Sequence, residues 1–208
     1  MKKIFVISVA TLISITLLSA DVTAQEKMSA EEKAKRMAAY YEIAGPGPEH
    51  KQLEARTGAW NQEVKYWMER DKPPMVITGT CESRMIMGGR FQSNECKSSA
   101  GGMTIESKSI IGFDRRHKKF TIVAFDSSAT YYVAAAGPYD EARKAIVMSG
   151  EDDDPVLGHK QIYDFVIRDV SPDQFVTEVI FKDEAHTQGK GDFKMVEVTF
   201  TRAKKETK

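Results

Sequence analysis

The sequence has few cysteines, no excess of either charge and, past its first residues, no long apolar run. Its 30 lysines and arginines are matched by 30 aspartates and glutamates, and the two signs are interspersed. Nucleic-acid-binding proteins usually carry a basic stripe, so we expect no nucleic-acid partner. No later segment approaches the ~20 apolar residues of a transmembrane helix, so we also expect no membrane span. Nothing in the composition indicates an oligomeric state.

The usual signatures of metal and cofactor sites are also missing. The histidines are His50, His117, His159 and His186; no two of them are three or four residues apart, and none neighbours a cysteine. This spacing does not match a zinc site, and no phosphate loop, nucleophile elbow or dinucleotide fingerprint occurs. We therefore predict neither a metal nor a cofactor, and expect the histidines in turns to be solvated. Ligation of haem by His186 or His159 is an alternative.

The first 24 residues have the pattern of a signal peptide. Lys2 and Lys3 precede the apolar run Ile4–Leu18, and small residues at Val22-Thr23-Ala24 suit a signal peptidase. Cleavage is expected after Ala24. The pattern predicts a periplasmic or secreted protein, in a compartment where disulfides persist.

Cys81 and Cys96 are placed to form a disulfide. Gly88-Gly89 separates two short strand-like runs, which is a strong hairpin signal. With these glycines as the two turn residues, the cysteines are equally far from the turn and directly opposed. Simple alternation predicts a hydrogen-bonded pair with Cα atoms ~5.5 Å apart, which a disulfide can bridge. A free or redox-active pair is the alternative, but no Cys-x-x-Cys motif supports it.

The rest of the chain divides into segments that differ in the periodicity of their apolar residues. Residues 25–57 are predicted to form a helical leader that starts at Ser29 and is interrupted by Ala44-Gly45-Pro46-Gly47-Pro48. Residues 58–203 are predicted to form one β-domain, and 204–208 a solvated, charged tail. Within 58–203 apolar and polar residues alternate with period two, and turn signals recur at intervals of roughly ten residues. We expect nine or ten antiparallel strands closing into an up-and-down barrel, with a two-sheet sandwich as the alternative.

Two positions at the ends of this region strengthen the prediction of a barrel. Gly58-Ala59-Trp60 begins the first strand-like run, and Arg202 ends the last. This resembles the Gly-x-Trp signature of lipocalins and other calycin barrels, in which a tryptophan on the first strand packs under an arginine from the last. A guanidinium on an indole face contributes ~0.5–2 kcal/mol. The resemblance implies that Gly58, Trp60 and Arg202 close the barrel base.

Further motifs extend the resemblance over about residues 48–203. They are Leu53, Gly88-Gly89-Arg90-Phe91, Gly112-Phe113-Asp114, Asp126-Ser127, Gly137 with Asp140, and Thr199-Phe200-Thr201-Arg202. In this order they resemble the domain of unknown function 1579 family, bacterial proteins taken to be lipocalin-like. Most are turn glycines and aspartates, so the resemblance implies a fold and no activity.

The barrel interior is the candidate functional site. Alternation predicts an inward set that is mostly apolar with a few hydroxyls, as in small-ligand sites: Tyr66, Met68, Met103, Ile105, Ser107, Ser109, Tyr163, Phe165, Ile167 and Phe181. We expect non-covalent binding of a small, largely apolar molecule, and no catalytic residues are assigned. The inward face of the Gly88 hairpin is left open, because both of its faces carry apolar residues.

Two other functions remain as alternatives. One is a hydrolase or isomerase with polar residues at the open end of the barrel, such as Asp126, Tyr131 or Arg84. The other is an envelope scaffold with a filled core. A convergent cluster with perturbed pKa values would indicate the enzyme, and a broad exposed apolar patch the scaffold.

Overall fold

A computed structural model describes residues 28–154, 156 and 158–204. The predicted signal peptide, residues 1–24, lies outside this range, as do residues 205–208 of the charged tail. The chain divides into two compact units between Gly45 and Pro46. The boundary thus falls before the second short helix of the expected leader, so that helix belongs with the strands.

The first unit contains helix α2, Ala30–Ala44, and its start follows from local chemistry. The Ser29 hydroxyl accepts a hydrogen bond from the Glu32 backbone N–H at 3.1 Å, and the Glu32 carboxylate accepts one from the Ser29 N–H at 3.0 Å. This capping box satisfies two N–H groups that the helix leaves unpaired. No residue of α2 is buried.

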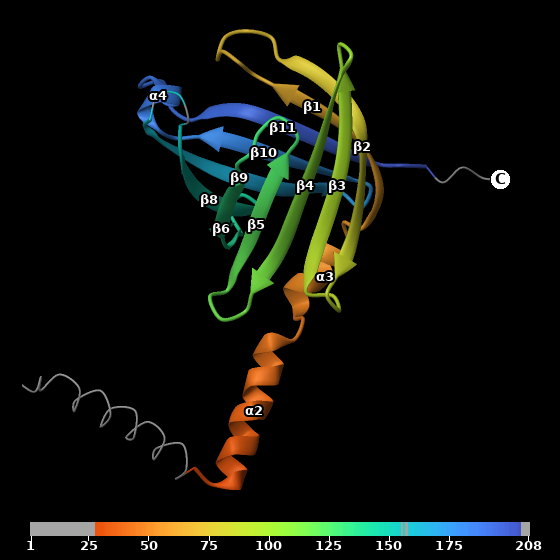
Figure 1. Ribbon diagram of the computed structural model, residues 1–208, viewed down its shortest axis with the longest axis vertical. Coiled ribbons are helices and arrows are strands. Elements are labelled where there is room, and N and C mark those ends of the chain that lie inside the picture. Colours follow the sequence, from red (N-terminus) through yellow and green to blue (C-terminus); the bar gives the residue numbers. More distant parts are fainter. Residues whose placement is uncertain (1–27, 155, 157, 205–208) are drawn as a thin grey trace, which may run out of the picture. The chain divides into compact units, whose positions relative to one another are not determined.

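The second unit is a β-barrel with two short helices (Figure 1). Its elements are α3 Pro48–Glu54, β1 Gly58–Tyr66, β2 Met75–Ile86, β3 Phe91–Ala100, β4 Met103–Asp114, β5 Lys119–Asp126, β6 Val133–Gly137, β7 Tyr139–Asp140, β8 Ala145–Asp153, β9 Lys160–Ser171, β10 Gln174–Phe181, α4 Glu184–Thr187 and β11 Phe193–Arg202. Among the described residues, no helix is both long and apolar enough to cross a bilayer.

All strand pairings are antiparallel, and they run around a closed ring. β1 to β6 pair in chain order, β1 also pairs with β11, and β11 to β8 continue the sheet. The ring closes where Ala136 of β6 lies opposite Ser149 of β8. The two-residue β7 pairs with β8 alone. The prediction of a closed antiparallel barrel of nine or ten strands is confirmed, with ten strands in the ring, and the continuous sheet rules out a two-sheet sandwich.

The hairpin of β2 and β3 has the predicted register and disulfide. Cys81 lies opposite Cys96, and the two sulfurs are bonded. The turn itself has four residues, Met87 to Arg90, and Gly88 and Gly89 both have positive φ. The predicted Cα separation was wrong, however. The two Cα atoms are 4.0 Å apart, nearer the ~4.5 Å of a non-hydrogen-bonded pair, because the longer turn shifts the alternation of the ladder.

One end of the barrel is covered by α3. Leu53 of this helix is fully buried in one apolar cluster with Trp60 and Phe120. The Trp60 indole donates a hydrogen bond to the Arg56 carbonyl at 3.0 Å, and the Arg202 guanidinium lies 4.2 Å from the centre of the Trp60 ring. Arg202 also donates to the Thr57 carbonyl at 3.0 Å. These contacts join the first strand, the last strand and α3 at the closed end.

Candidate functional site

The barrel encloses a cavity of about 510 Å³, within the size range of small-ligand sites. The interior is therefore not a filled core. The side chains lining the cavity come from the segment after α3, from β1 to β5 and the loop after β5, and from β9 to β11. They are Arg56, Gln62, Val64, Tyr66, Met75, Ile77, Gln92, Asn94, Cys96, Ser98, Ile105, Ser107, Lys108, Ser109, Ile111, Ile122, Ala124, Asp126, Ser128, Phe165, Ile167, Phe175, Thr177, Val179, Val196, Val198 and Phe200.

The wall formed by β2, β3 and β4 carries a connected row of polar side chains. The Ser83 hydroxyl donates to the Asn94 side-chain oxygen at 2.6 Å, and the Asn94 amide donates to the Ser109 hydroxyl at 3.0 Å. Nearby, the Gln62 amide donates to the Ser98 hydroxyl at 2.6 Å. Buried polar groups are retained at low cost when they are hydrogen-bonded in this way. This polar strip can offer both donors and acceptors to a ligand.

The opposite wall, formed by β9, β10 and β11, is apolar. Phe175 and Phe200 stack with ring centres 4.4 Å apart, and Trp60 meets Phe175 edge-on at 4.8 Å. Phe165 and Val198 belong to the same cluster as these rings. The cavity thus has one apolar side and one side on which polar and apolar residues are mixed, which suits an amphipathic molecule.

A buried arginine lies beside the closed end of the cavity. Arg56, directly after α3, is 4 % exposed, and its Nε and Nη2 each donate to a carboxylate oxygen of Asp169 at 2.7 Å. Its Nη1 is buried and has no hydrogen-bond partner among the described residues. A guanidinium has donors on two edges, and here one edge is paired while the other retains an unsatisfied donor. The Asp169 carboxylate balances the charge of Arg56, and the unsatisfied Nη1 is left as a hydrogen-bond donor at the closed end.

Comparison with known proteins identifies the family of this chain. The sequence profile of the family described as "Protein of unknown function (DUF1579)" matches residues 45–202. The chain belongs to this family. A search of the curated proteins found no match. Among solved structures, a redesigned β-barrel is similar at 11 % identity, covering 73 % of this chain and 95 % of its own, with a TM-score of 0.37. A likeness this low supports no functional argument.

Six of the ten predicted interior residues line the cavity of this DUF1579 protein. They are Tyr66, Ile105, Ser107, Ser109, Phe165 and Ile167. β4 alternates without interruption from Ile105 to Ser109, and β9 does so from Phe165 to Ile167. Alternation therefore places these side chains on one face of the sheet.

The other four predicted residues lie elsewhere. Met68 is 74 % exposed, because β1 ends at Tyr66 and the alternation does not continue into the loop; its predicted inward position was wrong. Tyr163 and Phe181 are buried in the apolar cluster but do not line the cavity. The Tyr163 hydroxyl instead donates to the Asp152 carboxylate at 2.7 Å. The side chain of Met103 lies outside the described residues.

The face of the Gly88 hairpin, which the sequence left open, is resolved by the structure. Gln92, Asn94, Cys96 and Ser98 face the cavity, and the Arg84 side chain is 56 % exposed and paired with Glu95 at 2.9 Å. The predicted interior set therefore omitted most of the polar residues that face the cavity. The disulfide was the available signal: a buried cystine marks the inner face, and period two then places the even-numbered residues of β3 inside. No comparable pattern in the sequence indicated that Arg56 lies at the cavity.

The residues named for an enzyme do not converge. Arg84 lies on the outer face of β2, and Tyr131 is 59 % exposed in the loop before β6. Asp126 of β5 lines the cavity, whereas Arg84 faces outward three strands away, and the Asp126 carboxylate accepts a hydrogen bond from the Ser128 N–H at 2.8 Å. No shared reaction centre can be built from these three side chains.

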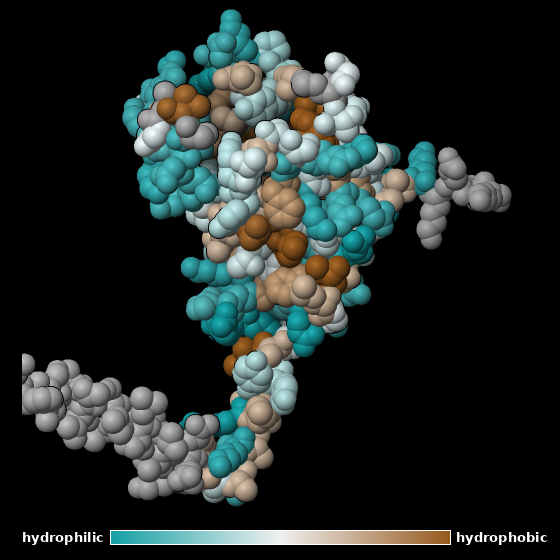
Figure 2. Space-filling view, in the orientation of Figure 1, coloured by the Kyte–Doolittle hydropathy of each residue, from teal (hydrophilic) through white to brown (hydrophobic). Residues whose placement is uncertain are grey.

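The broad apolar surface expected of a scaffold is also not seen on the face in view. Figure 2 shows a small apolar patch over β4 and β5, surrounded by hydrophilic residues. Val123 and Phe125 of β5 are 39 % and 43 % exposed. Scattered apolar side chains of this kind are normal on a protein surface.

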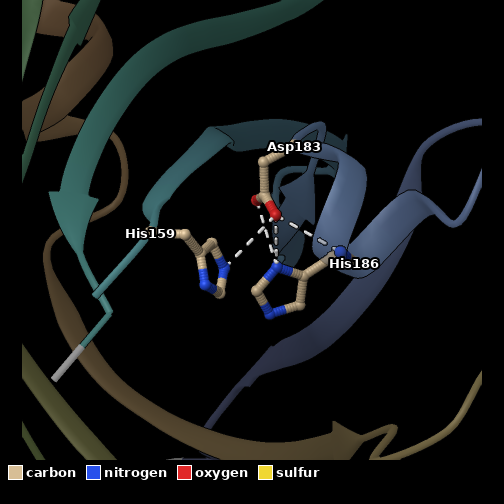
Figure 3. A group of neighbouring side chains, drawn as sticks. All are labelled: His159, Asp183 and His186. Carbon is tan, nitrogen blue, oxygen red and sulfur yellow. Dashed lines mark hydrogen bonds and ion pairs between the residues drawn. The ribbon is translucent and has the colours of Figure 1, made fainter. Parts of the chain in front are cut away.

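The expectation that His159 is a solvated turn residue was wrong. Its imidazole is 28 % exposed and lies beside that of His186, which is 17 % exposed, and between them is the buried carboxylate of Asp183. Figure 3 shows the three side chains. They come from the segment before β9 and the segment between β10 and β11, which is why their sequence spacing carried no metal signal.

Proposed function

We propose that this protein binds, without covalent chemistry, a small, largely apolar molecule inside the barrel. The observation that carries the proposal is the partly open interior cavity of about 510 Å³ with its apolar wall. Transfer of apolar surface from water into such a space is favourable by roughly 25 cal/mol per Å². The proposal includes export from the cytoplasm, supported by the signal-like first 24 residues and by the disulfide.

The polar side of the cavity supports a ligand with one polar head group. In the row from Ser83 through Asn94 to Ser109, the Asn94 amide and the Ser109 hydroxyl lie on the cavity lining. Arg56, whose charge is balanced by Asp169, keeps one unsatisfied N–H donor there. Hydrogen bonds to charged groups are stronger than those between neutral groups. An acidic head group directed toward Arg56, with an apolar tail along β9 to β11, is the arrangement we infer.

A cavity-filling variant tests whether the ligand is inside the barrel. Ile105→Trp adds bulk on the lining face of β4, and Val123→Trp adds the same bulk on the exposed face of β5. We expect a fluorescent fatty acid to bind the wild type and Val123→Trp equally, and to bind Ile105→Trp at least tenfold more weakly. Equal binding by all three proteins, with folding checked by circular dichroism, would refute an interior site.

A ligand series tests the head group separately. Competition by a long-chain fatty acid, the corresponding alcohol and the corresponding alkane compares the same tail with three ends. We expect the acid to compete best, because the unsatisfied N–H of Arg56 forms a stronger hydrogen bond with a charged acceptor, and the alkane to compete least. Equal competition by acid and alcohol would mean that the hydroxyl and amide groups of the polar strip bind the head group. Arg56 would then have only a structural role.

A further inference from the structure

His159, Asp183 and His186 are brought together by the β9–β10 hairpin. Tyr163 of β9 lies opposite Phe181 of β10, and this register continues as the Lys182 N–H donates to the Ile162 carbonyl at 2.8 Å. His159 is four residues before Tyr163, so the same register leads to the position four residues after Phe181. That position falls between Asp183 and His186. The cluster lies at the barrel end opposite α3, beside α4 (Figure 1).

The donor atoms of these three side chains face one another. His186 Nδ1 lies 2.8 Å from Asp183 Oδ1, and His159 Nε2 lies 3.7 Å from the same oxygen. All three ligand atoms lie within 4.8 Å of one another. In a tetrahedral zinc site with bonds of about 2.0–2.1 Å, neighbouring donors are about 3.3 Å apart. Modest rotation of the imidazoles would therefore bring the three atoms onto one ion.

The imidazole of His159 has one ring nitrogen whose hydrogen-bonding capacity is unsatisfied among the described residues. Its Nε2 is buried and makes no hydrogen bond to any described residue, although Asp183 Oδ1 is the oxygen it faces. An unsatisfied buried ring nitrogen is unfavourable, and a metal ion on its lone pair would satisfy it. Figure 3 shows both imidazole rings directed at the carboxylate.

The other two ligands are held in place by their surroundings. Asp183 accepts hydrogen bonds from the backbone N–H groups of Ile162 and His186, each at 3.2 Å, and its side chain is 7 % exposed. The His186 ring stacks on Phe181 with centres 4.1 Å apart. Such supporting contacts orient metal ligands.

We propose that His159, Asp183 and His186 form a binding site for one divalent transition-metal ion of the zinc class. Two imidazole nitrogens and one carboxylate oxygen suit Zn²⁺, and three protein ligands leave one position for water. The ion would tie the segment before β9 to α4 at the end of the barrel away from α3. This site is separate from the cavity, because none of its residues lines it.

Zinc titration of the full chain, purified without a polyhistidine tag, tests the site. Calorimetry is expected to give one Zn²⁺ per chain for the wild type. His159→Ala and His186→Ala should each weaken binding by more than about tenfold, because each removes a ligand. Substitution by Co²⁺ should give the ligand-field absorption of a tetrahedral ion in the wild type and not in these variants.

The matched control is His117→Ala, which removes an exposed histidine paired with Asp114 at the other end of the barrel. It should bind Zn²⁺ like the wild type. The proposal is overturned if the wild type binds no Zn²⁺, or if His117→Ala loses as much affinity as the other two variants. Circular dichroism of each variant separates loss of the site from loss of the fold.

Discussion

Gly58 explains at the residue scale why a glycine begins the first strand. Its φ is +113°, a conformation that residues with a Cβ atom rarely adopt, and a Cβ built there would lie 3.2 Å from Arg202 Nη1. The glycine thus permits both the backbone bend after α3 and the approach of Arg202 to Trp60. The glycine of the Gly-x-Trp pattern is thus favoured in this chain for a steric reason.

We expect Gly58→Ala to lower the free energy of unfolding by about 1–3 kcal/mol. The alanine would strain the backbone and press on the Arg202 guanidinium. Gly101→Ala is the control, because Gly101 also has a positive φ but a methyl group added there would meet no neighbouring atom. Urea unfolding measures both, and an equal loss in the two variants would show that contact with Arg202 contributes nothing.

His50 makes stability depend on pH at the same end of the barrel. It is 6 % exposed, its Nδ1 accepts a hydrogen bond from the Gly47 N–H at 2.9 Å, and its ring meets Phe113 edge-on. Burial, aided by the nearby Arg115 and Arg90 and opposed by Glu49, lowers its pKa below 6.5. The folded state therefore binds fewer protons than the unfolded state as the pH falls below 6.5. Stability contributed by neutral His50 is complete above that pH and is lost below it.

We expect His50→Gln to reduce this acid sensitivity. Glutamine at the third position of a helix can still accept a hydrogen bond from the capping residue, but it does not titrate. Urea midpoints measured from neutral pH down to about pH 5 should fall more steeply for the wild type than for the variant. Parallel curves would mean that other groups account for the pH dependence.

At the scale of elements, most of the tertiary contacts that can be predicted from the sequence are those across hairpins. The Gly88-Gly89 turn determined which residues of β2 and β3 face each other, and with them the disulfide. The same reasoning applies to the predicted turn at Ser171-Pro172-Asp173. Counting equal distances from Pro172 places His159 opposite Ala185, next to Asp183 and His186. Counting across this turn therefore predicts that the two histidines lie close together. The spacing of the histidines along the chain, on which the expectation of no metal site was based, does not predict it.

Removal of the disulfide tests how much it contributes to the hairpin. The Cys81→Ala/Cys96→Ala protein should unfold with a free energy about 3 kcal/mol lower than the wild type, because the 15-residue loop is no longer closed in the unfolded chain. Its far-ultraviolet circular dichroism should be unchanged, since the ladder and turn remain. Reductant should shift the urea midpoint of the wild type to that of the variant, and no shift would contradict a stabilising role.

At the scale of the whole molecule, the barrel interior combines contributions from most of the chain. The polar strip belongs to β1 to β4, the apolar wall to β9 to β11, and Arg56 to the segment after α3. Alternation predicted the lining residues of β4 and β9, where the ladders are regular. It failed at Met68, where the strand ends. It also placed Tyr163 and Phe181 in the cavity lining, whereas the Tyr163 hydroxyl bonds to β6 and β8 and Phe181 packs against Tyr163 and His186.

The sequence by itself determined the strands, the hairpin register, the disulfide and the closed barrel. Turn residues and period-two alternation act between neighbours, so they can be read along the chain. Only the tertiary structure decided that the interior is hollow, that Arg56 lies at its closed end and that the donor atoms of His159, Asp183 and His186 face one another. These features depend on how ten strands stagger around the ring and on the summed volumes of side chains that are far apart in sequence.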